Sequence, residues 1–245
     1  MKGVILAGGL ATRLRPLTLV TNKHLLPIYN RPMIYYPLEA MKKAGVSEVL
    51  LSTSSDHAGH FANLLQAGEE FDLKLYYAIQ QNARGGIAEA IYLAKEFAQN
   101  EPILVILGDN IFNHDLGKSI VKYENQGGGA MVFGVNKDTD SKQYGVIEVD
   151  NDGEVISIEE KPENPKSAIA QTGIYIYDKH VFDYIGRLKP SKRGELEVTD
   201  LNNLYLKENK LTCEMIDWWI DAGSSYDELL KANSQAFQLI EEGKL

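Results

Sequence analysis

The hydrophobic pattern begins with a strand over residues 3–7, where Val4, Ile5 and Leu6 stand together without a charge. An unbroken apolar run is typical of a strand buried on both faces of a parallel sheet. The same pattern predicts three further strands in the first half of the chain, at residues 49–51, 73–79 and 103–107. The first half is therefore expected to build a buried sheet.

Helices are predicted between these strands. Apolar residues recur at helical spacing from residue 32 to 43, and Gly45 supplies a stop. Two more helices are predicted at residues 57–65 and 87–97. Strands that alternate with helices of this length indicate βαβ units, hence a parallel sheet that binds ligands outside the carboxyl ends of its strands.

The second half of the chain shows shorter strands and an Asp152-Gly153 step that is typical of a hairpin. Strands are predicted at residues 131–135, 146–149, 155–160 and 173–177, and residues 211–216 lead into the aromatic run that begins at Trp218. Helices are predicted at residues 179–188, 199–207 and 226–240, with Thr199 as the cap of the second. We therefore expect one mixed α/β domain over residues 1–245, with a nucleotide-binding half at about 1–130 and a substrate-binding half at about 131–245.

Polar turns follow three of the predicted strands. After the first strand, Gly8 and Gly9 allow positive φ and the close approach of a ligand to bare amides. Donors and positive charge follow at Thr12, Arg13 and Arg15, which favours a bound phosphate chain over the alternative of an ordinary tight turn. The spacing fits neither the G-x-G-x-x-G fingerprint nor a P-loop. The other two turns are residues 80–86 and 108–110.

Composition narrows the classes of partner. The chain has 25 basic and 34 acidic residues, a formal net charge of -9, which is a poor match to nucleic acid. A phosphate site must therefore be built from a local basic cluster or from a metal. The single Cys213 excludes an intrachain disulfide and a thiolate zinc site. The N-terminus does not resemble a signal peptide and no apolar run has membrane-spanning length, so a cytoplasmic protein without a membrane partner is expected.

Two carboxylates stand after apolar segments that are far apart in the chain. Asp109 follows the strand at 103–107, and Asp221 follows an apolar, aromatic run. Either one alone could cap the next helix. Together, at one edge of the sheet and beside phosphate-binding turns, they fit a Mg²⁺ that also takes substrate phosphate oxygens.

The strand at 155–160 ends in Glu159-Glu160-Lys161-Pro162. Side chains alternate along a strand, so Glu160 and Lys161 are expected to point to opposite faces, and Pro162 stops the ladder. The alternative is a solvated strand end.

Four other features favour structural interpretations. His57 and His60 have helical spacing but no third metal ligand in view, and residues 138–140 lack the rest of a calcium loop. The tryptophans at 218–219 favour a core position over a stacking platform. The acidic segment at 194–200 suggests a second site, but capping of the following helix is preferred.

Ordered motifs over essentially the whole chain resemble those of the glucose-1-phosphate thymidylyltransferases in the sugar nucleotidyltransferase family. The motifs lie at residues 6–9, 12–14, 16–18, 23, 25–27, 32–36, 107–110, 144–146, 159–162, 172–175, 193–197 and 221–223. The resemblance implies the nucleotidyltransferase fold, a mixed, mainly parallel Rossmann-like sheet sandwiched by helices. It also implies a Mg²⁺-dependent enzyme.

The resemblance assigns the motif residues to four sets. The pyrimidine is held by Leu6, Ala7, Gly8, Gln80 and Gly86. The triphosphate is held by Gly9, Thr12, Arg13 and Lys23, with Asp109 completing the nucleotide-binding set. The sugar phosphate is held by Tyr144, Gly145, Glu160, Lys161 and Thr172. The metal is held by Asp109 and Asp221, and the charge-bearing catalytic residues are Arg13, Lys23, Asp109 and Lys161.

Two departures from the family pattern affect the nucleotide site. The segment 80–86 is one residue longer than the common pattern, so Gln81 is an alternative to Gln80. His24 stands where a glutamine is frequent.

The implied reaction is in-line attack of glucose 1-phosphate on the α-phosphorus of dTTP, giving dTDP-glucose and pyrophosphate. The nucleophile is already an anion, so no general base is needed and charge neutralisation dominates. Rival substrates are UTP with glucose 1-phosphate and GTP with mannose 1-phosphate. A non-catalytic sugar-nucleotide sensor is a rival of another class, which the retained Asp109, Asp221, Arg13 and Lys161 argue against.

The resemblance also implies assembly and regulation. Family members form dimers or tetramers, and the apolar stretch 33–41 is expected to serve an interface. A chain that ends at Leu245 is expected to lack the regulatory nucleotide site of longer members, so that dTDP-rhamnose would inhibit only at the active site.

Overall fold

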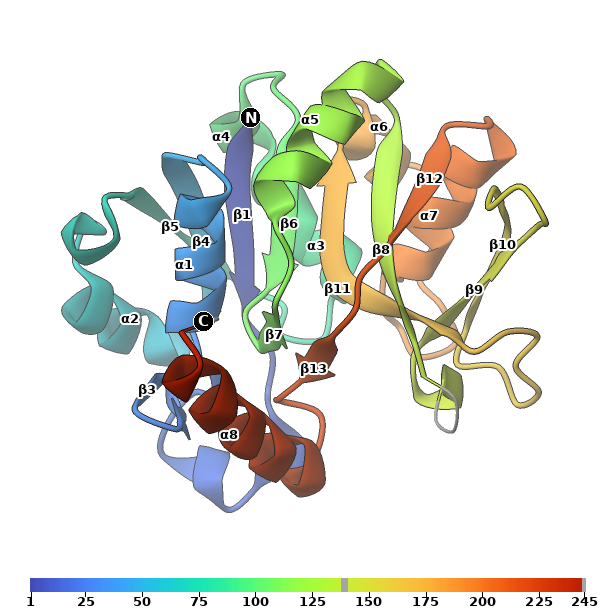
Figure 1. Cartoon of the computed structure of the whole chain (residues 1–245). Helices are drawn as coiled ribbons and strands as arrows, with labels where there is room; N and C mark the ends of the chain where they lie inside the picture. Colours follow the sequence, from blue (N-terminus) through green and yellow to red (C-terminus); the bar gives the residue numbers. More distant parts are fainter. Residues whose placement is uncertain (138–140, 244–245) are drawn as a thin grey trace.

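A nine-stranded sheet forms the centre of the protein, with helices packed on both of its faces (Figure 1). It is seen in a computed structural model that describes residues 1–137 and 141–243. The strands of this sheet are β1 (Lys2–Ala7), β4 (Glu48–Ser54), β5 (Lys74–Gln80), β6 (Ile103–Leu107), β8 (Ala130–Asn136), β9 (Gly145–Val149), β10 (Val155–Glu160), β11 (Ile169–Tyr177) and β12 (Leu211–Met215). The eight predicted strands are therefore confirmed, with ends that differ by a few residues, and β12 is an additional strand that the sequence pattern did not predict.

The sheet is parallel in its first half and mixed in its second. The order is β10-β9-β11-β6-β1-β4-β5, and β8 pairs with β11 and β12. Pairs among β6, β1, β4 and β5 are parallel, as predicted from the βα alternation. Strand β11 is antiparallel to β6, β8 and β9, and β9 and β10 form the predicted hairpin. Strand β11 thus joins the two halves of the sheet.

Eight α-helices lie in the described part of the chain. They are α1 (Tyr35–Lys43), α2 (Ala58–Leu65), α3 (Ile87–Tyr92), α4 (Lys95–Ala98), α5 (Leu116–Gln126), α6 (Val181–Ile185), α7 (Val198–Lys207) and α8 (Tyr226–Glu241). The single helix predicted at 87–97 is instead two short helices, α3 and α4. Helix α5 was not predicted, because its buried face includes the polar Ser119.

Two small ribbons stand apart from the main sheet. One pairs β2 (Pro27–Ile28) with β3 (Arg31–Pro32). The other pairs β7 (Asn110–Phe112) with β13 (Trp219–Asp221) in antiparallel fashion, with Asn110 opposite Asp221. This second ribbon brings together the two segments that carry the predicted carboxylates.

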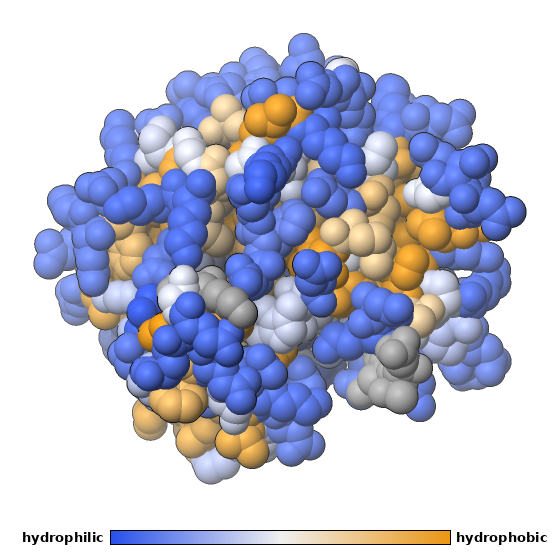
Figure 2. Space-filling model, viewed as in Figure 1, coloured by the Kyte–Doolittle hydropathy of each residue, from blue (hydrophilic) through white to orange (hydrophobic). Residues whose placement is uncertain are grey.

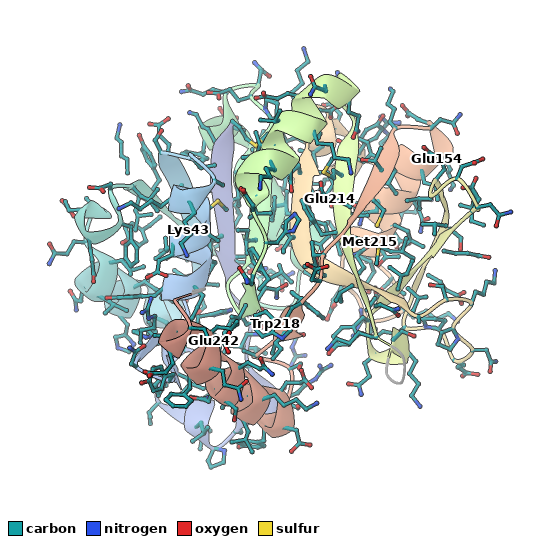
Figure 3. The ribbon with its side chains drawn as sticks, viewed as in Figure 1. Lys43, Glu154, Glu214, Met215, Trp218 and Glu242 are labelled. Carbon is teal, nitrogen blue, oxygen red and sulfur yellow. The ribbon has the colours of Figure 1, made fainter. Side chains whose placement is uncertain are left out.

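The core fills both sides of the sheet and the space beneath α8. Met33, Leu38 and Met41 are fully buried, so the prediction of an interface at residues 33–41 is wrong. Trp219 is buried, as predicted, and Trp218 is partly buried against the hydrophobic cluster that includes Ala232 and Ala236 of α8 (Figure 3). No helix in the described residues is long and apolar enough to span a membrane.

Candidate active site at the carboxyl edge of the sheet

Two adjoining cavities open where β1 and β6 end. The smaller has a volume of about 280 Å³ and the larger about 430 Å³. Both are lined by Lys23, Leu107 and Asp221. Binding at the carboxyl ends of parallel strands is the arrangement expected for this type of sheet. Ligands in the two cavities would therefore meet beside Lys23 and Asp221.

The smaller cavity contains most of the residues predicted to hold a base. Its walls include Leu6, Gly8, Gln80 and Gly86, while Ala7 is fully buried behind them. A Cβ atom on Gly8 would lie only 2.3 Å from Gln80 Oε1, so a side chain at position 8 would displace the Gln80 amide from its place in the cavity. The structure places Gln80, not the exposed Gln81, at the cavity.

Gly86 joins the nucleotide-side turn to the segment before α7. Its φ is +89°, and a Cβ atom there would lie 2.5 Å from the carbonyl oxygen of Leu196. The Leu196 N–H donates to the Gly85 carbonyl at 2.9 Å, which holds the two segments together. Both the backbone angle and the lack of space therefore require glycine at this position.

We expect Gly86→Ala to lower the free energy of unfolding by about 1–3 kcal/mol, through strain and the clash with Leu196. Gly127→Ala is the matched control, because Gly127 has a φ of +83° but an added Cβ would meet nothing within 4 Å. That control should lose only about 1 kcal/mol. Urea unfolding of both variants measures the difference, and equal losses would show that the Leu196 contact is unimportant.

The glycine turn after β1 lies between the two cavities. Gly9 has a φ of +93° and lines the smaller cavity, whereas Thr12 and Arg13 line the larger one. The Thr18 hydroxyl donates to the Ala11 carbonyl at 2.7 Å and braces the turn. Arg15, also predicted to add charge here, is absent from the lining of both cavities.

Asp109 and Asp221 are brought together by the β7–β13 ribbon. Asp109 is 5% exposed; its Oδ2 accepts a hydrogen bond from Lys23 Nζ, and its Oδ1 accepts one from Asn110 Nδ2 at 3.1 Å. A Cβ on Gly223 would lie 2.4 Å from Asp109 Oδ2, so the chain passes close to the carboxylate.

Neither carboxylate serves as a helix cap. The helix after Asp109 is α5, which is capped by the side chain of Asp115, and α8 is capped by Ser225. The capping alternative for the two predicted metal ligands is therefore wrong.

Burial and charge set the protonation of this cluster. Burial, followed by the charge of Asp109, raises the pKa of Asp221 to about 7. Burial also acts to raise the pKa of Asp109, but Lys23 outweighs it and holds that pKa below its usual range. Burial acts to lower the pKa of Lys23, yet Asp109 and Asp221 raise it overall. Asp109 and Asp221 thus lie beside one lysine, Lys23, and Asp109 is the carboxyl that pairs with it.

This donor set fits a divalent cation. Carboxylate oxygens are the ligands that Mg²⁺ prefers, and a Mg²⁺ site of one or two carboxylates is completed by water and substrate phosphates. Within residues 1–137 and 141–243, no three His, Cys, Asp or Glu side chains are arranged so that they alone could hold a metal ion. Asp109 and Asp221 would therefore share such an ion with oxygens from outside the protein.

The larger cavity contains the residues predicted to hold a sugar phosphate: Tyr144, Gly145, Glu160, Lys161 and Thr172. The prediction that Glu160 and Lys161 point to opposite faces is wrong, because both line this cavity. Strand β10 ends at Glu160, and Lys161 has a φ of +45°, which interrupts the alternation. Lys161 Nζ lies 3.8 Å from Glu160 Oε1.

The acidic segment before α7 is confirmed as the start of that helix, with Glu197 at the N-cap position and Asp200 in the first turn, but it supplies no side-chain capping hydrogen bond. The Glu197 side chain makes no capping hydrogen bond and instead pairs with Arg193 at 2.8 Å. Thr199, predicted as the cap, lies inside α7 and donates to Glu160 Oε2 at 2.6 Å. Glu195, Glu197 and Arg193 line the larger cavity, so this segment forms part of its wall.

Several cavity residues were missed by the sequence interpretation. They are Asn110, Gln171, Gly173, Arg193, Glu195, Glu197 and Trp219. Asn110 had a signal, since it directly follows Asp109 in a polar turn. It accepts from Gly173 N–H at 2.7 Å and from Trp219 Nε1 at 2.6 Å, and so ties β11 and β13 to the carboxylates.

His24 is buried at the back of the smaller cavity. Burial, followed by the charge of Lys23, lowers its pKa to about 3, so the ring is neutral. Its Nδ1 lies 2.6 Å from Asn22 Oδ1. The His57 and His60 rings lie 5.7 Å apart, with Ser54 Oγ 3.1 Å from His57 Nδ1. The turn predicted at residues 138–140 lies outside the described residues.

The sheet and the position of its cavities define an α/β protein of the nucleotide-binding class. The sequence profile of the nucleotidyl transferase family matches residues 2–238. The chain belongs to this family of enzymes, which confirms the resemblance inferred from its motifs.

Named relatives and solved structures agree with this membership. A glucose-1-phosphate thymidylyltransferase of Neisseria gonorrhoeae is 42% identical over 231 residues, covering 91% of this chain and 78% of that protein. Its counterpart in Actinoplanes sp. is 41% identical over 230 residues, covering 93% and 75%. A Bacillus anthracis structure assigned to the same enzymes, in complex with sucrose, has a TM-score of 0.91, 46% identity and coverage of 96% and 95%.

A solved structure with lower sequence identity has the same fold as this chain. A UDP-glucose pyrophosphorylase solved with UDP-glucose has a TM-score of 0.84 over 97% of this chain and 98% of its own, at 24% identity. The predicted α/β fold, a mostly parallel sheet between helices, is therefore confirmed.

Proposed function

We propose that the protein transfers a thymidylyl group from dTTP to glucose 1-phosphate, forming dTDP-glucose and releasing pyrophosphate. The observation that carries this proposal is the junction of two cavities at Lys23 and Asp221. One cavity has glycine turns suited to a nucleotide, and the other has polar groups suited to a sugar phosphate. The thymidylyltransferase relatives support dTTP and glucose 1-phosphate as the pair.

The nucleotide would lie along the turn after β1. Backbone groups from Leu6 to Gly8, with Gln80 and Gly86, would hold the base in the smaller cavity. Gly9, Thr12, Arg13 and Lys23 would hold the triphosphate through amides, a hydroxyl and positive charge. The leaving pyrophosphate would then depart past cationic side chains, which stabilise its developing charge.

The sugar phosphate would enter the larger cavity. Lys161 would attract its phosphate, and Glu160 would accept from sugar hydroxyls with Tyr144, Gly145 and Thr172 around them. A phosphate oxygen then forms the new bond to the α-phosphorus as the bond to the pyrophosphate oxygen breaks. Because the attacking oxygen is already an anion, no side chain has to remove a proton.

A divalent cation, Mg²⁺ in this proposal, would be held by Asp109 and Asp221. When bound, it would neutralise phosphate charge in the transition state. The protein's own contribution is to hold Asp109 in place through Lys23 and Asn110, and to bring Asp221 beside it through the β7–β13 ribbon.

The remaining proposals concern organisation. Residues 1–130 would form the nucleotide half and residues 131–245 the sugar-phosphate half of one domain, acting in the cytoplasm on a route such as that to dTDP-rhamnose. A homodimer or homotetramer is supported by exposed apolar side chains on α8, namely Tyr226, Leu230 and Phe237. Figure 2 shows apolar surface at this lower end of the molecule.

Pyrophosphate release tests the proposed function. We expect release from dTTP with glucose 1-phosphate in the presence of Mg²⁺, and little release after chelation by EDTA. UTP with glucose 1-phosphate and GTP with mannose 1-phosphate are the competing pairs. A higher kcat/KM for either would reassign the substrates, and sugar-nucleotide binding without any pyrophosphate release would favour the sensor.

A further inference from the structure

Gln171 presents a buried amide to the larger cavity. It lies on β11, is 6% exposed and lines the wall beside Gly145. Its neighbour Thr172 was the predicted sugar-binding residue, but the Thr172 hydroxyl donates to the Phe133 carbonyl at 3.0 Å. The pairing of β11 with β8 shifts register between Gln171 and Tyr175, at the point where the strand passes the cavity. The Gln171 amide is thus a neutral hydrogen-bonding group that this strand presents at the cavity, next to the hydroxyl of Tyr175.

A relay of buried hydrogen bonds orients that amide. Tyr177 OH donates to Asn202 Oδ1 at 2.7 Å, and Asn202 Nδ2 donates to Gln171 Oε1 at 3.1 Å. Gln171 Nε2 in turn donates to Tyr175 OH at 3.4 Å. Tyr177 and Asn202 are both fully buried, so the relay is shielded from water. An amide nitrogen carries two hydrogens, and one of those on Gln171 has no partner among the described residues.

Gly145 leaves room in front of this amide. A Cβ atom on Gly145 would lie 3.4 Å from Gln171 Cβ, 3.6 Å from Gln171 Cδ and 3.4 Å from Thr199 Oγ1. A side chain at that position would therefore fill the space between Gln171 and Thr199. The Thr199 hydroxyl donates to Glu160 Oε2. The space in front of Gly145 is therefore bounded by Gln171 on one side and by Thr199, with the Glu160 carboxylate bound to it, on the other.

We propose that Gln171 is a specificity-determining residue, which donates its remaining amide hydrogen to one hydroxyl of the sugar. Asn202 and Tyr177 are positioning residues that hold the amide in place. The inference rests on the proposed function and adds to it a residue that discriminates between sugars by one hydroxyl. A buried donor that matches a hydroxyl rejects an analogue lacking that hydroxyl, because the donor is then left unpaired.

The test compares glucose 1-phosphate with its 2-, 3-, 4- and 6-deoxy derivatives in wild type and Gln171→Met. Methionine has a similar length and no hydrogen-bonding amide. In wild type, removal of the hydroxyl bound by Gln171 is expected to lower kcat/KM by about 10- to 100-fold. In Gln171→Met, glucose 1-phosphate should fall to the level of that deoxy analogue, so the discrimination disappears. The KM for dTTP should stay unchanged.

Two further variants keep the result interpretable. Gln126→Met is the matched control, because Gln126 bonds Gly128 and Thr212 and is absent from the lining of the larger cavity. The triple variant Gln171→Met, Asn202→Leu, Tyr177→Phe removes the whole relay and leaves no orphaned amide, in case the single variant does not fold. It should show the same loss of discrimination.

The possible outcomes separate the inference from the proposed function. If wild type uses glucose 1-phosphate but the variants keep its full deoxy-sugar profile, or lose all five substrates equally, the role of Gln171 is overturned alone. If wild type releases no pyrophosphate from dTTP and glucose 1-phosphate, the proposed function is overturned and the inference falls with it.

Discussion

Asp109→Asn and Asp221→Asn are each expected to lower kcat by about 10²-fold or more, comparable to the loss of one preorganised electrostatic partner. Each substitution keeps the shape of the side chain but removes a charge from the buried pair beside Lys23. Turnover at saturating dTTP, glucose 1-phosphate and Mg²⁺ measures the effect. Near-normal Mg²⁺-dependent rates in both variants would contradict the proposed metal site.

The same two variants should differ in stability. Asp109→Asn leaves Lys23 without its ion-pair partner, so we expect the free energy of unfolding to fall by about 1–3 kcal/mol in metal-free buffer. Asp221→Asn removes a carboxyl group that faces Asp109, and should not destabilise the protein. Asp115→Asn is the matched control, since Asp115 caps α5 and asparagine caps equally well. Urea unfolding of the three variants measures these expected differences in the free energy of unfolding.

Lys161→Ala is expected to weaken glucose 1-phosphate use by about 10-fold or more while dTTP binding is retained, and Arg13→Ala is expected to weaken dTTP binding. Lys161 lines only the larger of the two cavities, on the half of the chain that carries Glu160. Arg13 belongs to the turn after β1, and its charge acts on both Lys23 and Asp221.

Calorimetric titration of dTTP, combined with the KM for glucose 1-phosphate, separates the two roles. Lys118→Ala is a control for the loss of one positive charge, because Lys118 is exposed on α5. If dTTP affinity collapses in Lys161→Ala and holds in Arg13→Ala, the assignment of the two cations is reversed.

The centre of the main sheet could be predicted from sequence because strands β1 and β6 are almost entirely apolar. Val4, Ile5 and the run at β6 leave no solvent face to interrupt the pattern. Helix α5 could not be found in this way, since it buries Ser119 and follows an irregular polar turn. The β7–β13 ribbon was also missed, because each strand has three residues and periodicity needs a longer segment.

The site residues were predictable where they directly follow a predicted strand. Asp109 follows β6, and its position at the carboxyl edge of the sheet comes from the parallel arrangement. The direction of Lys161 was not predictable, because the left-handed conformation at this lysine leaves no mark in the local pattern. Gln171 was missed for a related reason: its orientation depends on Asn202 and Tyr177, and only the folded sheet brings Asn202 beside it.

The ribbon of β7 and β13 also determines when Asp109 and Asp221 can come together during synthesis of the chain. The hydrogen bond between Asn110 and Trp219 spans 109 positions of the chain. Closing a flexible loop of that size costs about 4 kcal/mol in chain entropy, so the contact has to await folding of the intervening sheet. A nascent chain holds both glycine turns long before Asp221 leaves the ribosome. The growing polypeptide would therefore carry the features that attract a nucleotide well before it could act on one.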